Sequence, residues 1–252
     1  MKILVTFAVA SEFAVWRRHH DFRQIAHEPF ALYISEIGGN AVRALVTGMG
    51  TAAAVEATRW ALTSPADICI SSGFVGALNA DLSVGTVLAG RVVLRAEREL
   101  AVASDHQLLA LAQEAGAQQV ERFLTSEHLI ADAAQKVALQ AEADAVEMES
   151  FEVLLESAAY GVPAIAIRAV SDTVNDELPL DMNRIFTDEG QVSIPRVLGQ
   201  VALHPTSVPD LVRLGQNSKA AAEALARFLD KFVATVADRF QTLEKRTGVA
   251  AP

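Results

Sequence analysis

The stretch AVEMESFEVLLESAAYGVPAIAIRAVSD, residues 145–172, joins a cluster of acids to an alanine-containing segment and then to an apolar run. We predict a helix at 147–160. We predict a strand at 162–171, because VPAIAIRAVS is a short apolar run that breaks off at Asp172. The run is apolar enough to be covered on both faces of a sheet. A helix followed by a buried strand is typical of layered α/β proteins.

The same alternation continues along the chain. Further strands are predicted at 2–9, 31–38, 41–48, 66–73 and 85–94, and further helices at 10–20, 51–63, 105–115, 132–140 and 217–243. Gly38-Gly39-Asn40 is predicted to be a hairpin turn. No shift of composition divides the chain, so we predict a single α/β domain over residues 1–252. The segment 173–207 is rich in Pro, Asp and Asn, and is predicted to be an irregular excursion of the kind that often forms a lid.

Composition limits the classes of partner. The formal net charge of −10 disfavours nucleic-acid backbones and anionic membrane surfaces, which require a basic face. No apolar run approaches the roughly 20 residues of a membrane span, so stable membrane insertion is not expected. The single cysteine, Cys69, excludes an internal disulfide framework. A cytoplasmic location is therefore predicted.

Asp172 is the first candidate for chemistry. It ends a predicted central strand, and the carboxyl ends of strands in open α/β sheets face the ligand crevice. Partial desolvation there favours the neutral form of a carboxylic acid, which suits a reaction whose leaving group must accept a proton. The alternative, a helix N-cap, is about equally compatible with Ser171-Asp172 followed by a turn.

Three glutamates are further candidates. Glu149 lies where the helix 147–160 begins, and an ionised carboxylate there suits a bidentate grip on two vicinal hydroxyls. Glu147 is two residues away and cannot share a helix face with it, so at most one of them is expected to point into a given site. Glu12 follows the first strand. For Glu12 and Glu149 alike, simple complementarity to the helix dipole is an alternative.

Two glycine turns follow predicted strands, Gly48-Met49-Gly50 and Gly73-Phe74-Val75-Gly76. Such turns let the backbone approach a ligand closely, although neither matches a P-loop or G-x-G-x-x-G. The six histidines form no H-x-x-x-H pattern, and His19-His20 is interpreted as a solvated helix face. No metal and no cofactor are predicted.

These segments together resemble the nucleoside phosphorylase/nucleosidase superfamily over essentially the whole chain. The motifs that carry the resemblance are the first strand ending near Glu12, the turn Gly48–Gly50, SSGFVGAL (71–78) with VGTVL (84–88), VEMES (146–150) and IRAVSD (167–172). Methylthioadenosine/S-adenosylhomocysteine nucleosidases offer the most similar active-site pattern. The resemblance implies a three-layer fold with a central mixed twisted sheet flanked by helices, a nucleoside substrate and a homodimer.

Roles for individual residues are also implied by the resemblance. Asp172 is expected to protonate or hydrogen-bond N7 of a purine, Glu12 to activate the attacking water, and Arg168 to help hold that water. Glu149 is expected to bind the ribose hydroxyls. The remaining predicted substrate-binding residues are Met148, under the sugar, Leu129 and Ile130, at the base, and Glu147, Gly50, Gly73, Phe74 and Ser171.

Hydrolysis is preferred to phosphorolysis. Phosphorylases of the hexameric branch hold phosphate with an arginine and a serine where this chain has Ser71 and Phe74. The loss of these two anion contacts favours water as the nucleophile. The C-terminal part, with DEGQVSIPRVL (188–198), is similar to hopanoid-associated phosphorylases, which are implicated in removing adenine from adenosylhopane and which also tend to have an apolar residue at the position of Phe74.

We therefore predict cleavage of the N-glycosidic bond of a purine nucleoside, a 5′-modified adenosine, by hydrolysis. One alternative is phosphorolysis, with phosphate at Gly48–Gly50, including a hopanoid-linked adenosyl lipid as substrate. Another is a nucleoside-binding protein without turnover. The retention of Glu12, Arg168 and Asp172 together argues against a pure binder, because binding alone requires none of the water chemistry.

Overall fold

The computed structural model describes residues 1–96, 100–177 and 208–247 of the chain. Its strands are β1 (Lys2–Phe7), β2 (Arg23–Ala26), β3 (Ala31–Ile37), β4 (Asn40–Val46), β5 (Ile68–Ala77), β6 (Val87–Arg95), β7 (Leu100–Ala103), β8 (Gln118–Thr125), β9 (Ala145–Glu147) and β10 (Ala164–Asp172). Its helices are α1 (Ala10–His19), α2 (Thr51–Leu62), α3 (His106–Ala115), α4 (Ala133–Ala138), α5 (Ser150–Ala159) and α8 (Val208–Thr247).

All of these strands belong to one mixed sheet. Its order is β10-β6-β8-β9-β5-β1-β4-β3-β2, with β7 paired to β6. β5 also pairs directly with β10, so β5, β10, β6, β8 and β9 close into a ring. At the centre, β4, β1, β5 and β10 run parallel to one another. Their carboxyl ends therefore meet at one edge of the sheet, where ligands of open α/β sheets bind.

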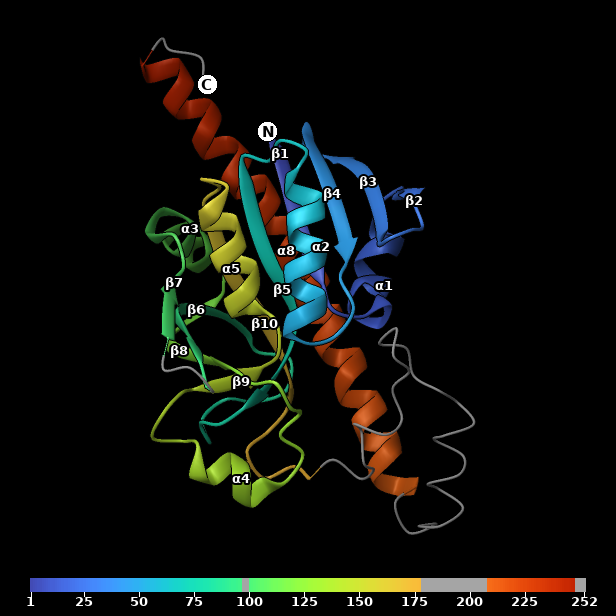
Figure 1. Cartoon of the computed structure of the whole chain (residues 1–252), viewed down its shortest axis with the longest axis vertical. Coiled ribbons are helices and arrows are strands. Elements are labelled where there is room, and N and C mark those ends of the chain that lie inside the picture. Colours follow the sequence, from blue (N-terminus) through green and yellow to red (C-terminus); the bar gives the residue numbers. More distant parts are fainter. Residues whose placement is uncertain (97–99, 178–207, 248–252) are drawn as a thin grey trace.

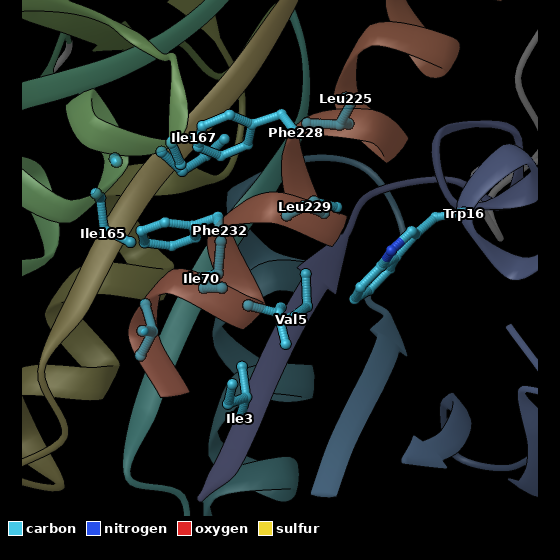
Figure 2. Packing of buried hydrophobic residues seen from close by; sticks show 14 of the residues in the cluster. Ile3, Val5, Trp16, Ile70, Ile165, Ile167, Leu225, Phe228, Leu229 and Phe232 are labelled. Atoms are coloured by element: carbon cyan, nitrogen blue, oxygen red, sulfur yellow. The ribbon is translucent and has the colours of Figure 1, made fainter. Parts of the chain in front are cut away.

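Helices cover both faces of the parallel strands. Alternate residues of β1 point to opposite sides, so Ile3 and Val5 pack with α8 whereas Leu4 packs with α2. Figure 2 shows Phe228 and Phe232 of α8 against the apolar side chains of β10 and its neighbours. In Figure 1, α2 and α5 lie on the opposite side of the sheet from α8. This three-layer α/β arrangement confirms the predicted fold class.

Helix α8 is anchored to α1 by one carboxylate. Asp230 accepts a hydrogen bond of 2.7 Å from Nε1 of Trp16. The same carboxylate contacts Nδ1 of His19 at 2.9 Å and Nε2 of His20 at 2.7 Å. The two histidines are therefore part of a helix–helix contact, which corrects the interpretation of a merely solvated face.

Several elements differ from the predictions. The strands β2, β7, β8 and β9 were not predicted, and α8 begins at Val208 rather than at residue 217. The predicted turn at Gly38-Gly39 does join β3 to β4, with both glycines at positive φ. The greater part of the predicted excursion, 178–207, lies outside the described residues, and so does the whole segment 188–198 with its similarity to hopanoid-associated proteins. None of the helices in the described ranges combines the length and apolar character needed to cross a bilayer.

Candidate active site

The residues predicted to form the site gather at the carboxyl ends of the parallel strands. Glu12 lies just after β1, Gly50 follows β4, and Gly73 and Phe74 belong to β5. Glu149 immediately precedes α5, whose opposite end leads into β10. The sheet thus brings together segments that are up to 160 residues apart, between Glu12 and Asp172.

Glu12 is buried, and its two carboxylate oxygens serve different partners. Oε2 accepts hydrogen bonds from the backbone N–H of Ala8, at 2.8 Å, and of Val9, at 3.2 Å, which caps the first turn of α1. Oε1 accepts a hydrogen bond of 2.8 Å from the N–H of Phe74. Glu12 therefore is both a helix-capping acid, as in the alternative reading, and a group directed at the site.

Glu149 is the N-cap residue of α5, but its side chain does not cap that helix. Oε1 accepts a hydrogen bond of 2.9 Å from the N–H of Gly50, across the sheet edge. Gly50 has φ = 85°, a backbone conformation that glycine adopts without strain. In this conformation its N–H donates to the carboxylate of Glu149. The turn after β4 is thus joined to the start of α5.

Arg168 of β10 lies between these carboxylates, with 1% of its side chain exposed. Nη1 contacts Glu149 Oε2 at 3.4 Å, and Nη2 forms an ion pair of 2.5 Å with Glu147 Oε2. Nε and Nη2 donate to Oγ of Ser150, at 3.1 and 3.0 Å, and Nη2 also donates to Oγ of Ser71 at 3.3 Å. The guanidinium is therefore fixed from several directions.

Glu147 corrects one expectation. It ends β9 rather than lying in the helix, so the helix-face argument does not apply, and both Glu147 and Glu149 contact Arg168. Glu147 also accepts hydrogen bonds from Oγ1 of Thr125 and from the N–H groups of Glu149 and Ser150. With 1% of its side chain exposed, it supports Arg168 and is not placed to bind substrate as predicted.

Charge in this cluster is unbalanced, because one guanidinium faces three buried carboxylates. Burial raises the pKa of Glu149 to about 7, with Glu147 and Glu12 adding to the rise and Arg168 opposing it. Burial also raises the pKa of Glu12, against the lowering effects of Arg168 and of three backbone N–H groups. Burial lowers the pKa of Arg168, but the three carboxylates outweigh it and raise the value.

Gly73 is required by the close approach of these groups. A Cβ at this position would lie 2.5 Å from Nη1 of Arg168 and 2.6 Å from Oε1 of Glu12. The next residue, Phe74, is half-buried and packs against the larger core cluster. The glycine therefore lets an acid and a cation meet against the backbone of β5.

Asp172 is the last residue of β10. Arg168 pairs with Gly73 and Asp172 with Gly76, so the two are separated by three residues of the neighbouring strand β5, about 10 Å. A bulge at Ser171 shifts the register, so Val170 pairs with Val75 whereas Asp172 pairs with Gly76. Such bulges re-aim side chains at the ends of strands. Oδ1 of Asp172 accepts a hydrogen bond of 2.8 Å from Oγ of Ser171.

The carboxylate of Asp172 lies directly over Gly76, where a Cβ would be 2.9 Å from its Oδ2. No helix starts in residues 173–177, so the N-cap alternative for Asp172 is wrong within the part of the chain that the structure describes. Its partner is instead Lys136 of α4, a residue that the sequence analysis did not single out. Gly76, Ser71, Ser150 and Thr125 were likewise not assigned roles.

The remaining predicted residues border this edge. Met148, Leu129 and Ile130 are half-buried, and Ile130 packs beside Val146, the residue of β9 that pairs with Gly76. Beyond Asp172 lies an open groove between the end of β10 and the start of α8, lined by Asp172, Asp176, Glu177, Asp210, Arg213, Leu214 and Asn217. The groove does not include the carboxylates around Arg168. Among the described residues, no three His, Cys, Asp or Glu side chains are arranged to hold a metal ion.

The chain thus combines a three-layer α/β fold with a buried cluster of acids at the carboxyl ends of its parallel strands. The family model described as the Phosphorylase superfamily matches residues 2–202, and the chain belongs to this superfamily. This match confirms the predicted superfamily.

Solved structures give the same fold. A 5′-methylthioadenosine/S-adenosylhomocysteine nucleosidase from Neisseria meningitidis, in complex with methylthio-immucillin-A, superposes with a TM-score of 0.73 at 19% identity, covering 93% of this chain and 99% of that one. The corresponding nucleosidase from Campylobacter jejuni gives 0.71 at 19% identity, with 93% and 99% covered. Futalosine hydrolase from Helicobacter pylori gives 0.71 at 17% identity, with 92% and 97% covered. No curated protein matches by sequence.

Proposed function

We propose that this protein hydrolyses the N-glycosidic bond of a purine nucleoside, and that its substrate is a 5′-modified adenosine. The reaction breaks the bond between C1′ of the ribose and N9 of the base. The bonding electron pair leaves with the base, and a water oxygen bonds to C1′ after losing a proton. Solved structures of the same fold are named as nucleosidases or as a hydrolase, which supports this choice.

Glu12 is proposed to take the proton from the attacking water. Its Oε1 keeps one lone pair beyond the hydrogen bond from Phe74, and it lies beside Nη1 of Arg168. The raised pKa makes this carboxylate a stronger base than an exposed glutamate, which brings it closer to the range useful near neutral pH. Arg168 is proposed to help hold the water through Nη1, whose hydrogen bonds to Glu149 Oε2 and to the carbonyl oxygen of Phe74 are long, at 3.4 and 3.5 Å.

Glu149 is proposed to bind the two vicinal hydroxyls of the ribose. An ionised carboxylate offers about four lone-pair positions, and the hydrogen bond from Gly50 and the contact with Arg168 use only two of them. Glu149 contacts the guanidinium of Arg168, and Glu12 lies near the same guanidinium beside Gly73, so a sugar bound by Glu149 would lie close to the proposed water. Met148, half-buried next to Glu149, supplies an apolar surface for the sugar.

Asp172 is proposed to stabilise the departing base by protonating or hydrogen-bonding N7. Its separation from Arg168 along β10 is comparable to the length of a nucleoside. The base would therefore lie toward Asp172, with Leu129 and Ile130 beside it, while the sugar lies toward the carboxylate cluster. This follows the two-carboxylate plan of inverting glycosidases, in which acid and base stand on opposite sides of the sugar.

The observation that carries hydrolysis rather than phosphorolysis is the occupation of two backbone amides. The N–H of Gly50 donates to Glu149 and the N–H of Phe74 donates to Glu12, so one amide of each glycine turn is taken by an internal carboxylate. A phosphate dianion would have to displace these carboxylates and then lie beside them. Repulsion between like charges in a buried site disfavours that arrangement, whereas water has no such cost.

The 5′ substituent is proposed to be apolar. Phe74 is half-buried, packs against the core and contacts Glu12 through its backbone N–H, so it adds an apolar side chain near the carboxylate cluster. This observation also favours a second candidate substrate, an adenosyl lipid of the hopanoid type.

The predicted homodimer remains a proposal that size-exclusion chromatography with light scattering can test.

A substrate panel tests the proposal. The protein is incubated with adenosine, methylthioadenosine, S-adenosylhomocysteine, inosine and an adenosyl lipid, with and without phosphate, and the released base is quantified by chromatography. We expect adenine release from at least one 5′-modified adenosine at the same rate with and without phosphate. Strict dependence on phosphate would overturn hydrolysis, and binding without release would establish the non-catalytic alternative.

A further inference from the structure

Lys136 is a buried cation next to the proposed leaving base. None of its surface is exposed, and its ammonium group forms an ion pair with Oδ2 of Asp172. The same nitrogen donates to the backbone carbonyl oxygens of Thr173, at 3.1 Å, and of Asp176, at 3.0 Å. A lysine ammonium has three N–H donors, so all three are satisfied by these acceptors.

The burial of Lys136 is not explained by the helix that carries it. Within α4, all of which the structure describes, Lys136 is the one buried residue. Helix α4 spans six residues and is capped by Asp132, whose carboxylate accepts from the N–H groups of Ala134 and Gln135. In Figure 1, α4 lies at the lower end of the molecule, beyond β9. Because burying a charge is costly without a partner, the acceptors at the end of β10 fix the position of this lysine.

Asp172 has limited freedom once this ion pair is formed. Lys136 holds Oδ2, Ser171 donates to Oδ1, and the carboxylate lies against the backbone of Gly76. Each oxygen keeps one lone pair, and 12% of the Asp172 side chain remains exposed. The carboxyl group is therefore held in one orientation with a free side.

We propose that Lys136 is a positioning residue for the departure of the base, acting through Asp172. This inference rests on the proposed function, because it assigns Lys136 a part in the same bond cleavage. As the C1′–N9 bond breaks, the bonding electron pair stays on the base, and N7 takes the proton of the neutral Asp172 carboxyl group. Lys136 and Ser171 both donate to this carboxyl group, which leaves its proton on the free side, and the Lys136 cation balances the carboxylate that forms when the proton is given up. No covalent step involves Lys136 itself.

A double-mutant cycle tests this role. Lys136→Met, which keeps the length of the side chain and removes the charge, is made in the wild-type protein and in Asp172→Asn. Lys219→Met is the matched control, because Lys219 is 76% exposed on α8 and contacts only Glu223, at 4.0 Å, among the ion pairs formed by the described residues. Turnover is measured with the adenosine derivative that the wild type cleaves fastest, and folding is checked by thermal melting.

We expect Lys136→Met to lower kcat about 10- to 100-fold in the wild-type background, a part of the effect of a general acid. In the Asp172→Asn background the same substitution should lower kcat less than about threefold, because coupled residues are not additive. Lys136→Arg, which keeps the cation, should retain a higher kcat than Lys136→Met. Lys219→Met should match the wild type.

Equal losses from Lys136→Met in both backgrounds would show a merely structural role and overturn the inference. So would a kcat within twofold of the wild type, or equal kcat values for the Met and Arg variants. If Lys136→Met does not fold, Lys136→Arg is compared in the wild-type and Asp172→Asn backgrounds instead, and the same criteria apply. If the wild-type protein releases base from no nucleoside, the proposed function fails instead, and the two failures are distinct.

Discussion

Nucleoside binding is predicted to weaken as the pH falls below 7, because Glu149 must be ionised to accept hydrogen bonds from the ribose hydroxyls. Burial raises the pKa of this side chain to about 7. With that value, the ionised fraction is about 0.9 at pH 8, about 0.1 at pH 6 and about 0.01 at pH 5. The association constant should therefore fall about tenfold between pH 8 and pH 6, and about 90-fold between pH 8 and pH 5.

The measurement is isothermal titration calorimetry with a carbon-linked adenosine analogue, whose glycosidic bond cannot be hydrolysed. Binding rather than turnover is measured, so that titration of the proposed base Glu12 does not enter through the chemical step. Glu149→Gln is the control variant. Glutamine keeps the shape of the side chain and an acceptor oxygen for the N–H of Gly50, but it does not titrate.

The Gln variant should bind more weakly than the wild type at pH 8 and show little dependence on pH. A wild-type transition near 4.5, the ordinary value for glutamate, would refute the argument that burial near two other carboxylates controls this group. The same pH dependence in Glu149→Gln would assign the transition to another residue.

Other perturbations follow from the same geometry. Because the pKa of Glu149 is raised to about 7, this side chain favours the folded state below about pH 4.5, and the stabilisation is lost as the pH rises through about 7. Glu149→Gln should therefore raise Tm at pH 8 but not at pH 4, as measured by differential scanning fluorimetry. Gly73→Ala places a Cβ 2.5 Å from Nη1 of Arg168 and should lower kcat/KM by about 100-fold, with circular dichroism showing a retained fold; near wild-type activity would mean that the cluster is not catalytic. Phe232→Ala, in the core between α8 and the sheet, should lower the free energy of unfolding in urea by about 3–5 kcal/mol, and a loss below about 1 kcal/mol would contradict the described packing. Asp230→Ala removes the acceptor shared by three aromatic side chains of α1 and should cost about 1–3 kcal/mol in the same assay; an unchanged unfolding curve would show that this contact does not stabilise the fold.

The strands at the centre of the sheet could be predicted because each is a mostly apolar run. β1 and β10 are covered on both faces, so their composition indicates their position directly. β8 was missed because four of its first five residues are exposed and polar, which leaves no continuous apolar run. β9 has three residues and forms only because β5 and β8 pair with it, information that no local pattern contains.

The site residues likewise divide into those that the sequence could predict and those that it could not. Glycine turns and acids after strands indicated where Glu12, Glu149 and Asp172 would gather, because parallel strands end at one edge. Lys136 was missed because a lone lysine in a short helix is typical of a solvent-exposed face, and its burial depends on acceptors from the distant end of β10. The position of Glu147 was misjudged because α5 begins at Ser150, three residues later than predicted.

The two oxygens of Glu12 link reactivity to the first turn of α1. One oxygen closes the open end of that helix, and the other faces the proposed water, so the side chain cannot swing without uncapping the helix. Fraying of the first turn of α1 is therefore expected to abolish turnover while the rest of the molecule stays folded. On gradual warming, loss of turnover should precede the global melting transition.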